Sequence, residues 1–419
     1  MKPVICDLKT LYQKNYEAQL RRYKAAELRF AEHFGTLDNP RFFSAPGCAE
    51  ICGSQTEHNN GKVFLASVDA DTIAVAQPTD DGMIRIKSDD DSFPEFSANI
   101  NELDISDNEK GTSAAFLKGL VKGFKNNGLE AGGFSAFVSS AVSDKAELSH
   151  DTSFEILVGT IICHLFNGGQ IPQKTLAQIV HRAAKDYCGG SRYISKHIAC
   201  AYGNFTMIDY RDGDNTPVIE NVRCDFRSFG HALCIVDAND RAVDFSEERR
   251  AIETEMKAVA GYFDCDNLRS IALPDVTLNI NELRRAFGDR AVLRSIHFFH
   301  ENQRVERMIH ALKNESFDDF LNAIRESGDS AFKYLQNVCP ASDVRKQSLS
   351  IALNTAENTL HRRGACRVHS DGFSGAIQAF VPNEDLQQFK MNLEKVFGTG
   401  SCYVLTVRGV GGTEVILNA

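Results

Sequence analysis

The chain has 419 residues, 43% of them hydrophobic and 24% charged, and a formal net charge of -10. That length allows two domains, because one hydrophobic core stops growing at about 250 to 300 residues, and the composition excludes a disordered chain. The negative charge and the scattered Lys and Arg residues argue against a nucleic-acid partner.

Twelve cysteines raise the question of disulfides or a metal site. Residues 1–30 lack the apolar core of a signal peptide, so we expect a cytoplasmic protein with free thiols. Cys48 and Cys52 are close in sequence, but no second close pair of Cys or His accompanies them, and we predict no metal site. The longest apolar run, residues 156–166, is too short to span a bilayer, so no membrane partner is predicted.

The first part of the chain predicts a mixture of helices and strands. Apolar residues at helical spacing predict a helix over residues 8–34. Residues 42–68 predict two apolar strands around a polar segment, which suits a site for a polyhydroxylated ligand, although an ordinary glycine-containing loop is the alternative. Residues 72–76 and 83–87 alternate around a Thr-Asp-Asp-Gly turn and predict a β-hairpin. Further helices are predicted at 112–126, 153–166, 175–188 and 195–202, and strands at 132–142 and 204–210.

The second part of the chain continues this mixture. A strand is predicted at 232–236, a charged amphipathic helix at 247–263, mostly helical structure at 305–337 and a helix at 347–362. The chain then predicts strand, helix, strand and strand at 376–381, 386–397, 402–407 and 413–417. Because the two kinds of element do not alternate as regular βαβ units, we predict an α+β fold.

Residues 45–59, A-P-G-C-A-E-I-C-G-S-Q-T-E-H-N, resemble the galactokinase signature of the GHMP small-molecule kinase superfamily, approximately A-P-G-R-T-E-I-G-G-N-H-T-D-H-N. The resemblance extends over the chain, including residues 154–159 and 366–382. It implies an N-terminal domain at 1–213, like domain 2 of ribosomal protein S5, and a ferredoxin-like C-terminal domain at 214–419. It also implies phosphorylation of galactose to galactose 1-phosphate with Mg-ATP, and a sugar-like ligand as partner.

The phosphate-binding loop of the family corresponds to residues 144–155. In the family, glycines there bring backbone N–H groups to the nucleotide phosphates. Lys145 and Glu147 replace the two glycines, and Asp151 replaces a Ser. A carboxylate about 5 Å from a phosphate charge opposes binding by roughly 3 kcal/mol at an effective dielectric near 20. A helix N-terminus favours an anion by only about 0.3 to 2 kcal/mol.

Ser149 and Thr152 are hydroxyl residues of the same loop. Thr152 and Glu155 form a T-x-x-E pattern, which predicts a capping box at the start of the next helix. Such a helix end satisfies its own N–H donors without a nucleotide. We therefore interpret the loop as structural and predict no cofactor, Mg-ATP being implied only by the resemblance.

Two positions of the family's catalytic pair are substituted. Lys196 falls where the family has the Asp that polarises the anomeric hydroxyl, and Cys48 falls where it has an Arg beside the transferred phosphoryl group. A Lys accepts no proton at pH 7 unless burial lowers its pKa by several units, and loss of a positioned base costs about 10²- to 10⁴-fold in rate. The alternative is a rearranged site, with Lys196 replacing the Arg and His197 acting as base.

The positions that bind sugar hydroxyls in the family are substituted as well. They correspond to Ser54, Gln55 and Glu57, and Glu57 keeps the charge of the family's Asp on a longer side chain. Arg249 falls where the family has a Tyr.

The sequence thus yields a principal hypothesis and two alternatives. The first is a galactokinase-like protein that has lost most or all phosphotransfer and serves as a binding or regulatory module with an unidentified protein partner. The second is an active galactokinase or related sugar kinase with a rearranged site. In the third, Glu147, Asp151 and Asp371 make the former nucleotide cleft acidic, which suits a cationic or uncharged ligand.

Overall fold

The computed structural model describes residues 5–35, 39–89, 95–189, 193–214, 216–238, 245–373 and 375–417. Their helices are α1 (Leu8–Tyr12), α2 (Tyr16–Phe34), α3 (Ser113–Asn126), α4 (His150–Asn167), α5 (Gln173–Cys188), α6 (Ser195–Tyr202), α7 (Ser246–Tyr262), α8 (Leu273–Leu278), α9 (Ile280–Phe287), α10 (Asp289–Lys313), α11 (Phe317–Ser330), α12 (Ser348–Leu360) and α13 (Leu386–Phe397). Their strands are β1 (Ile5–Asp7), β2 (Arg41–Cys52), β3 (Lys62–Thr79), β4 (Met83–Ser88), β5 (Phe96–Asn99), β6 (Gly133–Ser140), β7 (Phe205–Asp209), β8 (Val218–Val222), β9 (His231–Asp237), β10 (Ala365–Val368), β11 (Ala376–Pro382), β12 (Cys402–Leu405) and β13 (Thr413–Ile416).

The strands form two sheets. The larger sheet has nine strands in the order β1-β13-β2-β3-β6-β4-β5, and β7 and β8 extend it beside the first half of β3. The smaller sheet is antiparallel and has the order β10-β11-β9-β12. The predicted α+β class is therefore confirmed.

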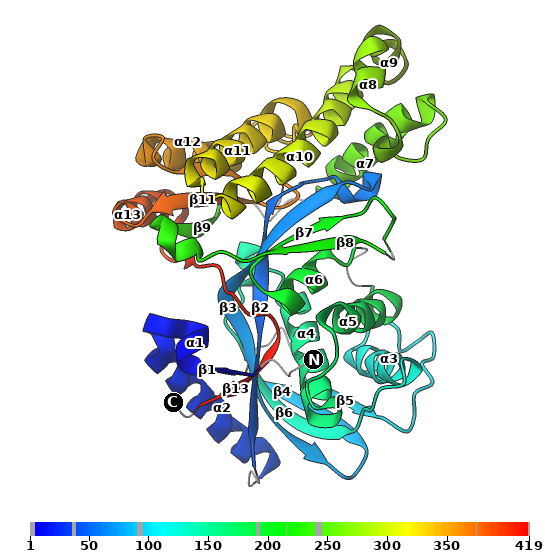
Figure 1. Ribbon diagram of the computed structural model, residues 1–419, viewed down its shortest axis with the longest axis vertical. Helices are drawn as coiled ribbons and strands as arrows, with labels where there is room; N and C mark the ends of the chain where they lie inside the picture. Colours follow the sequence, from blue (N-terminus) through cyan, green and yellow to red (C-terminus); the bar gives the residue numbers. More distant parts are fainter. Residues whose placement is uncertain are drawn as a thin grey trace.

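Helices cover both faces of the nine-stranded sheet (Figure 1). Alternate residues of a strand point to opposite faces. Ile73 and Val75 of β3 accordingly pack with α1 and α2, whereas Ala74 and Ala76 pack in the cluster that holds α3, α4, α5 and α6. The apolar alternation of β3 thus places it between two helical layers.

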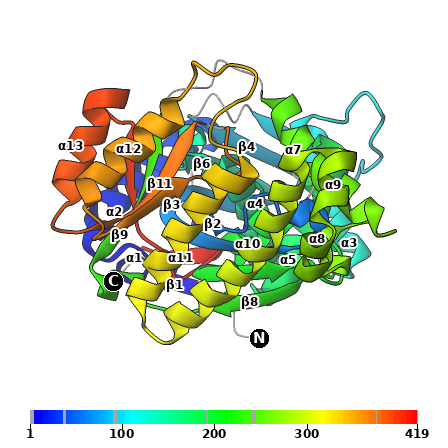
Figure 2. The ribbon, with the colours of Figure 1, turned by 90° about the horizontal axis from the view of Figure 1, so that it is seen from above.

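The four-stranded sheet is also covered on both faces. Cys234 and Val236 of β9 pack with α12 and α13, whereas Leu233 and Ile235 pack with α10 and α11. Seen from above, α10 and α11 lie across the ends of β2 and β3 (Figure 2). The smaller sheet reaches the same end of β2, because Arg367 of β10 and Gln378 of β11 both donate hydrogen bonds to the Ile51 carbonyl oxygen.

The hairpin predicted between residues 72–76 and 83–87 is wrong. Asp81 does make the turn, since its carboxylate accepts hydrogen bonds from the Thr79 hydroxyl and the Met83 N–H. However, β6 lies between the two strands, antiparallel to β3 and parallel to β4. The local turn was predictable, but the pairing depends on a strand from far along the chain.

The predicted domain boundary at 213/214 stays a prediction. Segments beyond it join the nine-stranded sheet, because β8 pairs with β7 and β13 pairs with β1 and β2.

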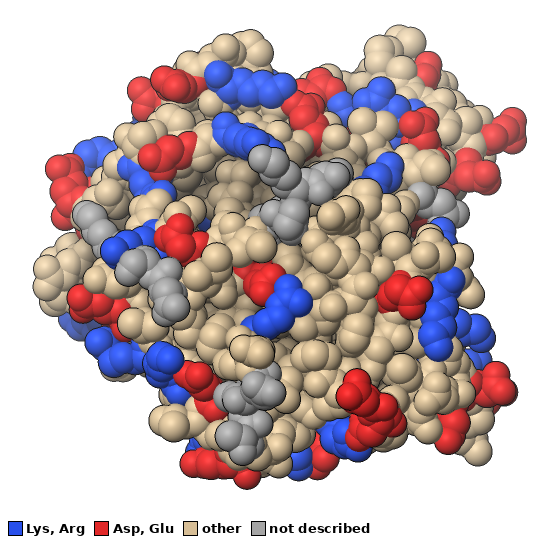
Figure 3. Space-filling model, turned by 60° about the horizontal axis from the view of Figure 1, so that its bottom comes forward, with Lys and Arg blue, Asp and Glu red and all other residues tan. Residues whose placement is uncertain are grey.

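No described helix combines the length and apolar character that crossing a bilayer requires. On the face shown in Figure 3, basic and acidic side chains are interspersed.

Candidate functional site

A pocket of about 340 Å³ lies beside the end of β2. The turn after β2, the first turns of α6 and α7, and the turn after β10 surround it. The resemblance and the structure thus converge on one place, since four of the predicted site residues line the pocket: Gln55, Glu57, Lys196 and Arg249. The other lining residues are Glu50, His58, Tyr193, Ser195, Arg250, Glu253, Ser370 and Asp371.

Glu57 is held by two hydroxyl groups. Its Oε1 accepts hydrogen bonds from Ser195 Oγ at 2.6 Å and from the Tyr210 hydroxyl at 3.0 Å. Burial raises the pKa of Glu57 to about 7, although these two hydrogen bonds favour its charged form. The carboxyl group is thus fixed in orientation and titrates near neutral pH.

Glu50 is a second carboxyl group of the pocket, and it is buried. Burial, with the nearby charges of Asp371 and Glu57, raises the pKa of Glu50 to about 8. At neutral pH this group is therefore mostly protonated and can donate a hydrogen bond.

The Glu50→Gln variant is expected to become more stable than the wild type as pH rises. The folded-state pKa of about 8 exceeds the ordinary value of 4.5, so the folded protein binds the extra proton and loses stability as pH rises from 4.5 through 8. Gln carries no such charge. We expect unfolding free energies near the wild type's at pH 4.5 and a gain of up to about 5 kcal/mol at pH 9, since one pKa unit is about 1.4 kcal/mol. Urea titrations across this range measure it, and a constant difference would contradict it.

The structure does not place Ser54 in the lining of the pocket. Its hydroxyl is fully buried, lies 2.9 Å from a Glu50 oxygen and 2.8 Å from the Ser370 carbonyl oxygen, and accepts a 2.5 Å hydrogen bond from Arg367. Because these contacts use its hydrogen-bonding capacity, Ser54 supports the wall of the pocket from behind.

Lys196 lines the pocket from the first turn of α6. Burial alone would lower the pKa of Lys196, but Asp371 foremost, with Cys48, Glu50 and Glu147, raises it above the ordinary value. The ammonium group is therefore charged at neutral pH. Among the described residues, no carboxylate oxygen lies within ion-pair distance of it.

Cys48 and His197 lie outside the lining. The buried Cys48 thiol is 3.3 Å from Ser149 Oγ, and its hydrogen bonds with Cys200 and Ser149 lower its pKa. The His197 ring is fully buried, with Nε2 2.8 Å from a Glu155 carboxylate oxygen. The structure thus does not bring His197 to the pocket.

The predicted capping box is wrong. Helix α4 begins at His150 with Ser149 as its N-cap, and no side-chain hydrogen bond caps it. Thr152 is the third helical residue, and Glu155 binds His197 instead. The helix starts earlier than its apolar pattern suggests because the chain is already anchored upstream, where the Cys48 N–H donates to the Leu148 carbonyl oxygen at 3.0 Å.

The remaining loop residues lie at the same end of α4. Lys145 and Asp151 are exposed, whereas Glu147 is half-buried and has a left-handed backbone with φ of 52°. His150 and Lys196 hold the pKa of Asp151 below its ordinary value. Glu147 also raises the pKa of Lys196. The carboxylates of Glu147 and Asp151 therefore both interact electrostatically with the Lys196 ammonium group.

Sequence reasoning missed three residues that shape the pocket: Glu50, Ser195 and Tyr210. Glu50 belongs to the signature segment, and Ser195 precedes Lys196, so the motifs gave a signal for both. Tyr210 follows β7 and reaches Glu57 only through the fold.

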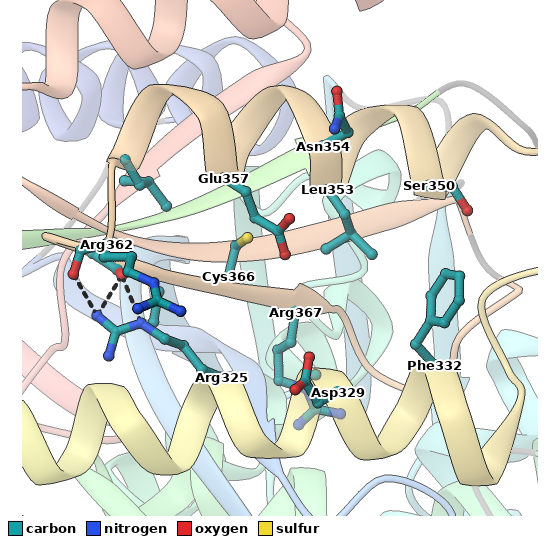
Figure 4. A pocket seen from close by; sticks show the side chains of 14 residues that line it. Arg325, Asp329, Phe332, Ser350, Leu353, Asn354, Glu357, Arg362, Cys366 and Arg367 are labelled. Atoms are coloured by element: carbon teal, nitrogen blue, oxygen red, sulfur yellow. Dashed lines mark hydrogen bonds between the residues drawn. The ribbon is translucent and has the colours of Figure 1, made fainter.

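A larger cavity of about 600 Å³ lies between α11 and α12 above β10 (Figure 4). Leu353 and Glu357 of α12 point toward Phe332 and Asp329 across it. The Arg325 guanidinium at one end donates hydrogen bonds to the carbonyl oxygens of Arg362 and Gly364 and therefore stabilises the turn before β10. None of the residues predicted for the site lines this cavity.

Comparisons with known proteins agree with the resemblance. The galactokinase galactose-binding signature matches residues 28–78. A galactokinase of Lactococcus lactis subsp. lactis is 24% identical over 401 residues, which cover 92% of this chain and 95% of that protein. A galactokinase of Clostridium tetani is 25% identical over 395 residues, which cover 92% and 96%.

Two solved structures show the same fold. The crystal structure of L. lactis galactokinase complexed with galactose has a TM-score of 0.73 at 22% identity and covers 94% of this chain and 99% of that one. A mevalonate kinase has a TM-score of 0.61 at 14% identity, covering 88% and 99%. The predicted two-domain GHMP-kinase fold is therefore confirmed, and over most of its length the chain is similar in sequence to galactokinases.

Proposed function

We propose that this protein binds a monosaccharide in the pocket beside β2 and transfers phosphate to it at a strongly reduced rate or not at all. The galactose-binding signature at residues 28–78 supports a sugar ligand. The observation that carries the second part is Lys196, an ammonium group in a pocket where the resemblance implies a carboxylate base.

Lys196 is unsuited to act as that base. Its pKa is raised rather than lowered, so no free amine is available at neutral pH to accept the proton of a sugar hydroxyl. His197 cannot take over in this arrangement, because its Nε2 is bound to Glu155 in the interior.

The residues present also fit Mg-ATP poorly. At the end of α4, Glu147 and Asp151 add two negative charges where the resemblance implies the nucleotide phosphates. A carboxylate about 5 Å from a phosphate charge opposes it by roughly 3 kcal/mol at an effective dielectric near 20, which exceeds the roughly 0.3 to 2 kcal/mol from a helix N-terminus. Weak nucleotide binding follows from this balance.

Calorimetric titration and a turnover assay test the proposal together. We expect a heat of binding with a monosaccharide, none with Mg-ATP at micromolar concentrations, and no galactose 1-phosphate above the background of a no-protein control. Micromolar binding of Mg-ATP with turnover to galactose 1-phosphate would defeat the proposal.

A second candidate function is an active sugar kinase, and Glu57 is the observation that favours it. This carboxyl group lines the pocket, is oriented by Ser195 and Tyr210, and has a pKa of about 7, which is suited to a general base. In that case a panel of monosaccharides with Mg-ATP gives a product, and Glu57→Gln lowers kcat by about 10²- to 10⁴-fold. An unchanged kcat in Glu57→Gln would exclude this role.

A further inference from the structure

The pocket beside β2 contains two cationic side chains that form no ion pair with any residue that the structure describes. The Arg249 side chain lines the pocket from the first turn of α7, and its Nε is buried without a hydrogen bond. Lys196 faces the same pocket from α6. Among the described residues, neither group has a carboxylate oxygen within ion-pair distance, although a buried cationic donor without a partner is costly.

Most of the acidic groups of the pocket are already engaged. The Glu57 carboxylate accepts hydrogen bonds from Ser195 and Tyr210, and the Glu253 carboxylate receives the Lys257 ammonium at 2.6 Å. Glu50 is bound to the buried Ser54 hydroxyl. Asp371 is exposed and acts on Lys196 most strongly, together with Glu50 and Glu147.

Both cations stand at positions that the resemblance assigns to the sugar side of the site. Lys196 replaces a carboxylate there and Arg249 replaces a neutral phenol, so the two substitutions together add three units of positive charge. The opposite change, an Arg replaced by Cys48, removes positive charge on the phosphoryl side. Compared with the family, the site has therefore gained positive charge on the sugar side and lost it on the phosphoryl side.

We propose that the pocket takes a monosaccharide bearing an anionic group, a carboxylate or a phosphate, which Lys196 and Arg249 bind together. The inference rests on the proposed function, since it takes the pocket to hold a monosaccharide. The planar guanidinium of Arg249 presents paired N–H donors that match a carboxylate or phosphate, and Lys196 adds a point charge. Gln55 and the second carboxyl oxygens of Glu50 and Glu57, whose Oε1 atoms contact Ser54, Ser195 and Tyr210, are left to bind the hydroxyl groups.

Calorimetric titrations of the full chain at pH 7 test this assignment with galactose, galacturonate, galactose 1-phosphate and inorganic phosphate. We expect one acidic sugar to bind at least ten-fold more tightly than galactose, and the better of the two identifies carboxylate or phosphate as the group. Its affinity should fall as NaCl is raised, because salt screens the charge attraction. Inorganic phosphate alone should bind more weakly than that sugar, because it lacks the hydroxyl groups.

Substitutions of the two cations give the second part of the test. Arg249→Gln and Lys196→Gln should each lower the affinity for the acidic sugar at least ten-fold more than the affinity for galactose. Arg363→Gln, which removes an exposed cation paired with Glu384, is the control and should change neither. Because Arg249 forms no ion pair with the described residues, Arg249→Gln should keep the wild-type melting temperature, whereas a merely structural role would lower it. Lys196→Gln loses the attraction of Asp371 and should melt at a lower temperature, so its binding is measured well below its melting transition.

The outcomes separate this inference from the proposed function. Equal or tighter binding of galactose, or equal losses for both sugars in the variants, would overturn the inference and leave the proposed function standing. Turnover of galactose with Mg-ATP would overturn the proposed function but not the preference for an acidic sugar. The absence of binding by every sugar would overturn both.

Discussion

Replacing Asp71 with alanine is expected to lower the free energy of unfolding by about 3 to 5 kcal/mol, the usual cost of leaving buried charges without a partner. Asp71 lies on β3 and is completely buried. It receives Arg22 of α2 at 2.6 Å and Arg408, near the C-terminus, at 2.9 Å. The Tyr12 and Ser44 hydroxyls donate to the same carboxylate. Its removal takes the charged acceptor from two guanidinium groups and two hydroxyls, and leaves the guanidinium groups with backbone carbonyl oxygens only partly satisfying them.

The pH dependence of unfolding gives an independent measure of how much the Asp71 carboxylate contributes to stability. Burial would raise the pKa of Asp71, but the charges of Arg22 and Arg408 hold it below the ordinary value of 3.8. Its contribution is therefore present above pH 3.8 and is lost as pH falls through the lower folded-state value. In Asp71→Ala this part of the acid-induced loss should disappear.

The control for Asp71 is Glu32→Ala in α2. Glu32 pairs with Arg29, and both side chains are more than half exposed, so we expect a loss of no more than about 1 kcal/mol. Urea denaturation followed by circular dichroism measures both variants. A loss of less than about 1 kcal/mol in Asp71→Ala would show that the buried network is not held by its charge.

The second large effect is expected for Glu301→Ala, with a loss of about 3 to 5 kcal/mol in unfolding free energy. Glu301 of α10 is completely buried. It pairs with Arg304 at 2.7 Å and Arg367 at 3.8 Å, and it accepts hydrogen bonds from the Gly53 N–H and the Ser327 hydroxyl. These neighbours lower the pKa of Glu301 despite its burial.

The same substitution should weaken sugar binding, because Glu301 lies behind the wall of the pocket. Arg367 donates to the Ile51 carbonyl oxygen and to Ser54, which contacts the pocket residue Glu50. Loss of Glu301 leaves Arg367 without its buried counter-charge. We expect the dissociation constant of the bound sugar to rise under conditions where the variant is still folded.

The control for Glu301 joins the same two helices. Glu326 of α11 pairs with Arg307 of α10, and both side chains are about half exposed. Glu326→Ala should therefore cost no more than about 1 kcal/mol and leave sugar binding unchanged. Equal losses of unfolding free energy in Glu301→Ala and Glu326→Ala, measured by urea denaturation, would show that burial does not increase the contribution of the Glu301 ion pairs to stability.

The α+β class, the positions of most helices and strands, and several residues of the pocket could be predicted from the amino-acid sequence. Periodic apolar residues predicted these elements because one face of each must be buried. The signature segment and two distant motifs led to Gln55, Glu57, Lys196 and Arg249, and the fold brings all four to one pocket.

Which strands pair, and where each side chain of a motif points, depends on the folded chain. The turn at Asp81 is local, but β6 separates the two strands that it joins. Ser54 and His197 stand beside pocket residues in sequence, yet Arg367 and Glu155 hold them in the interior. Strand pairing and burial depend on contacts between segments far apart in the chain, and no local pattern contains them.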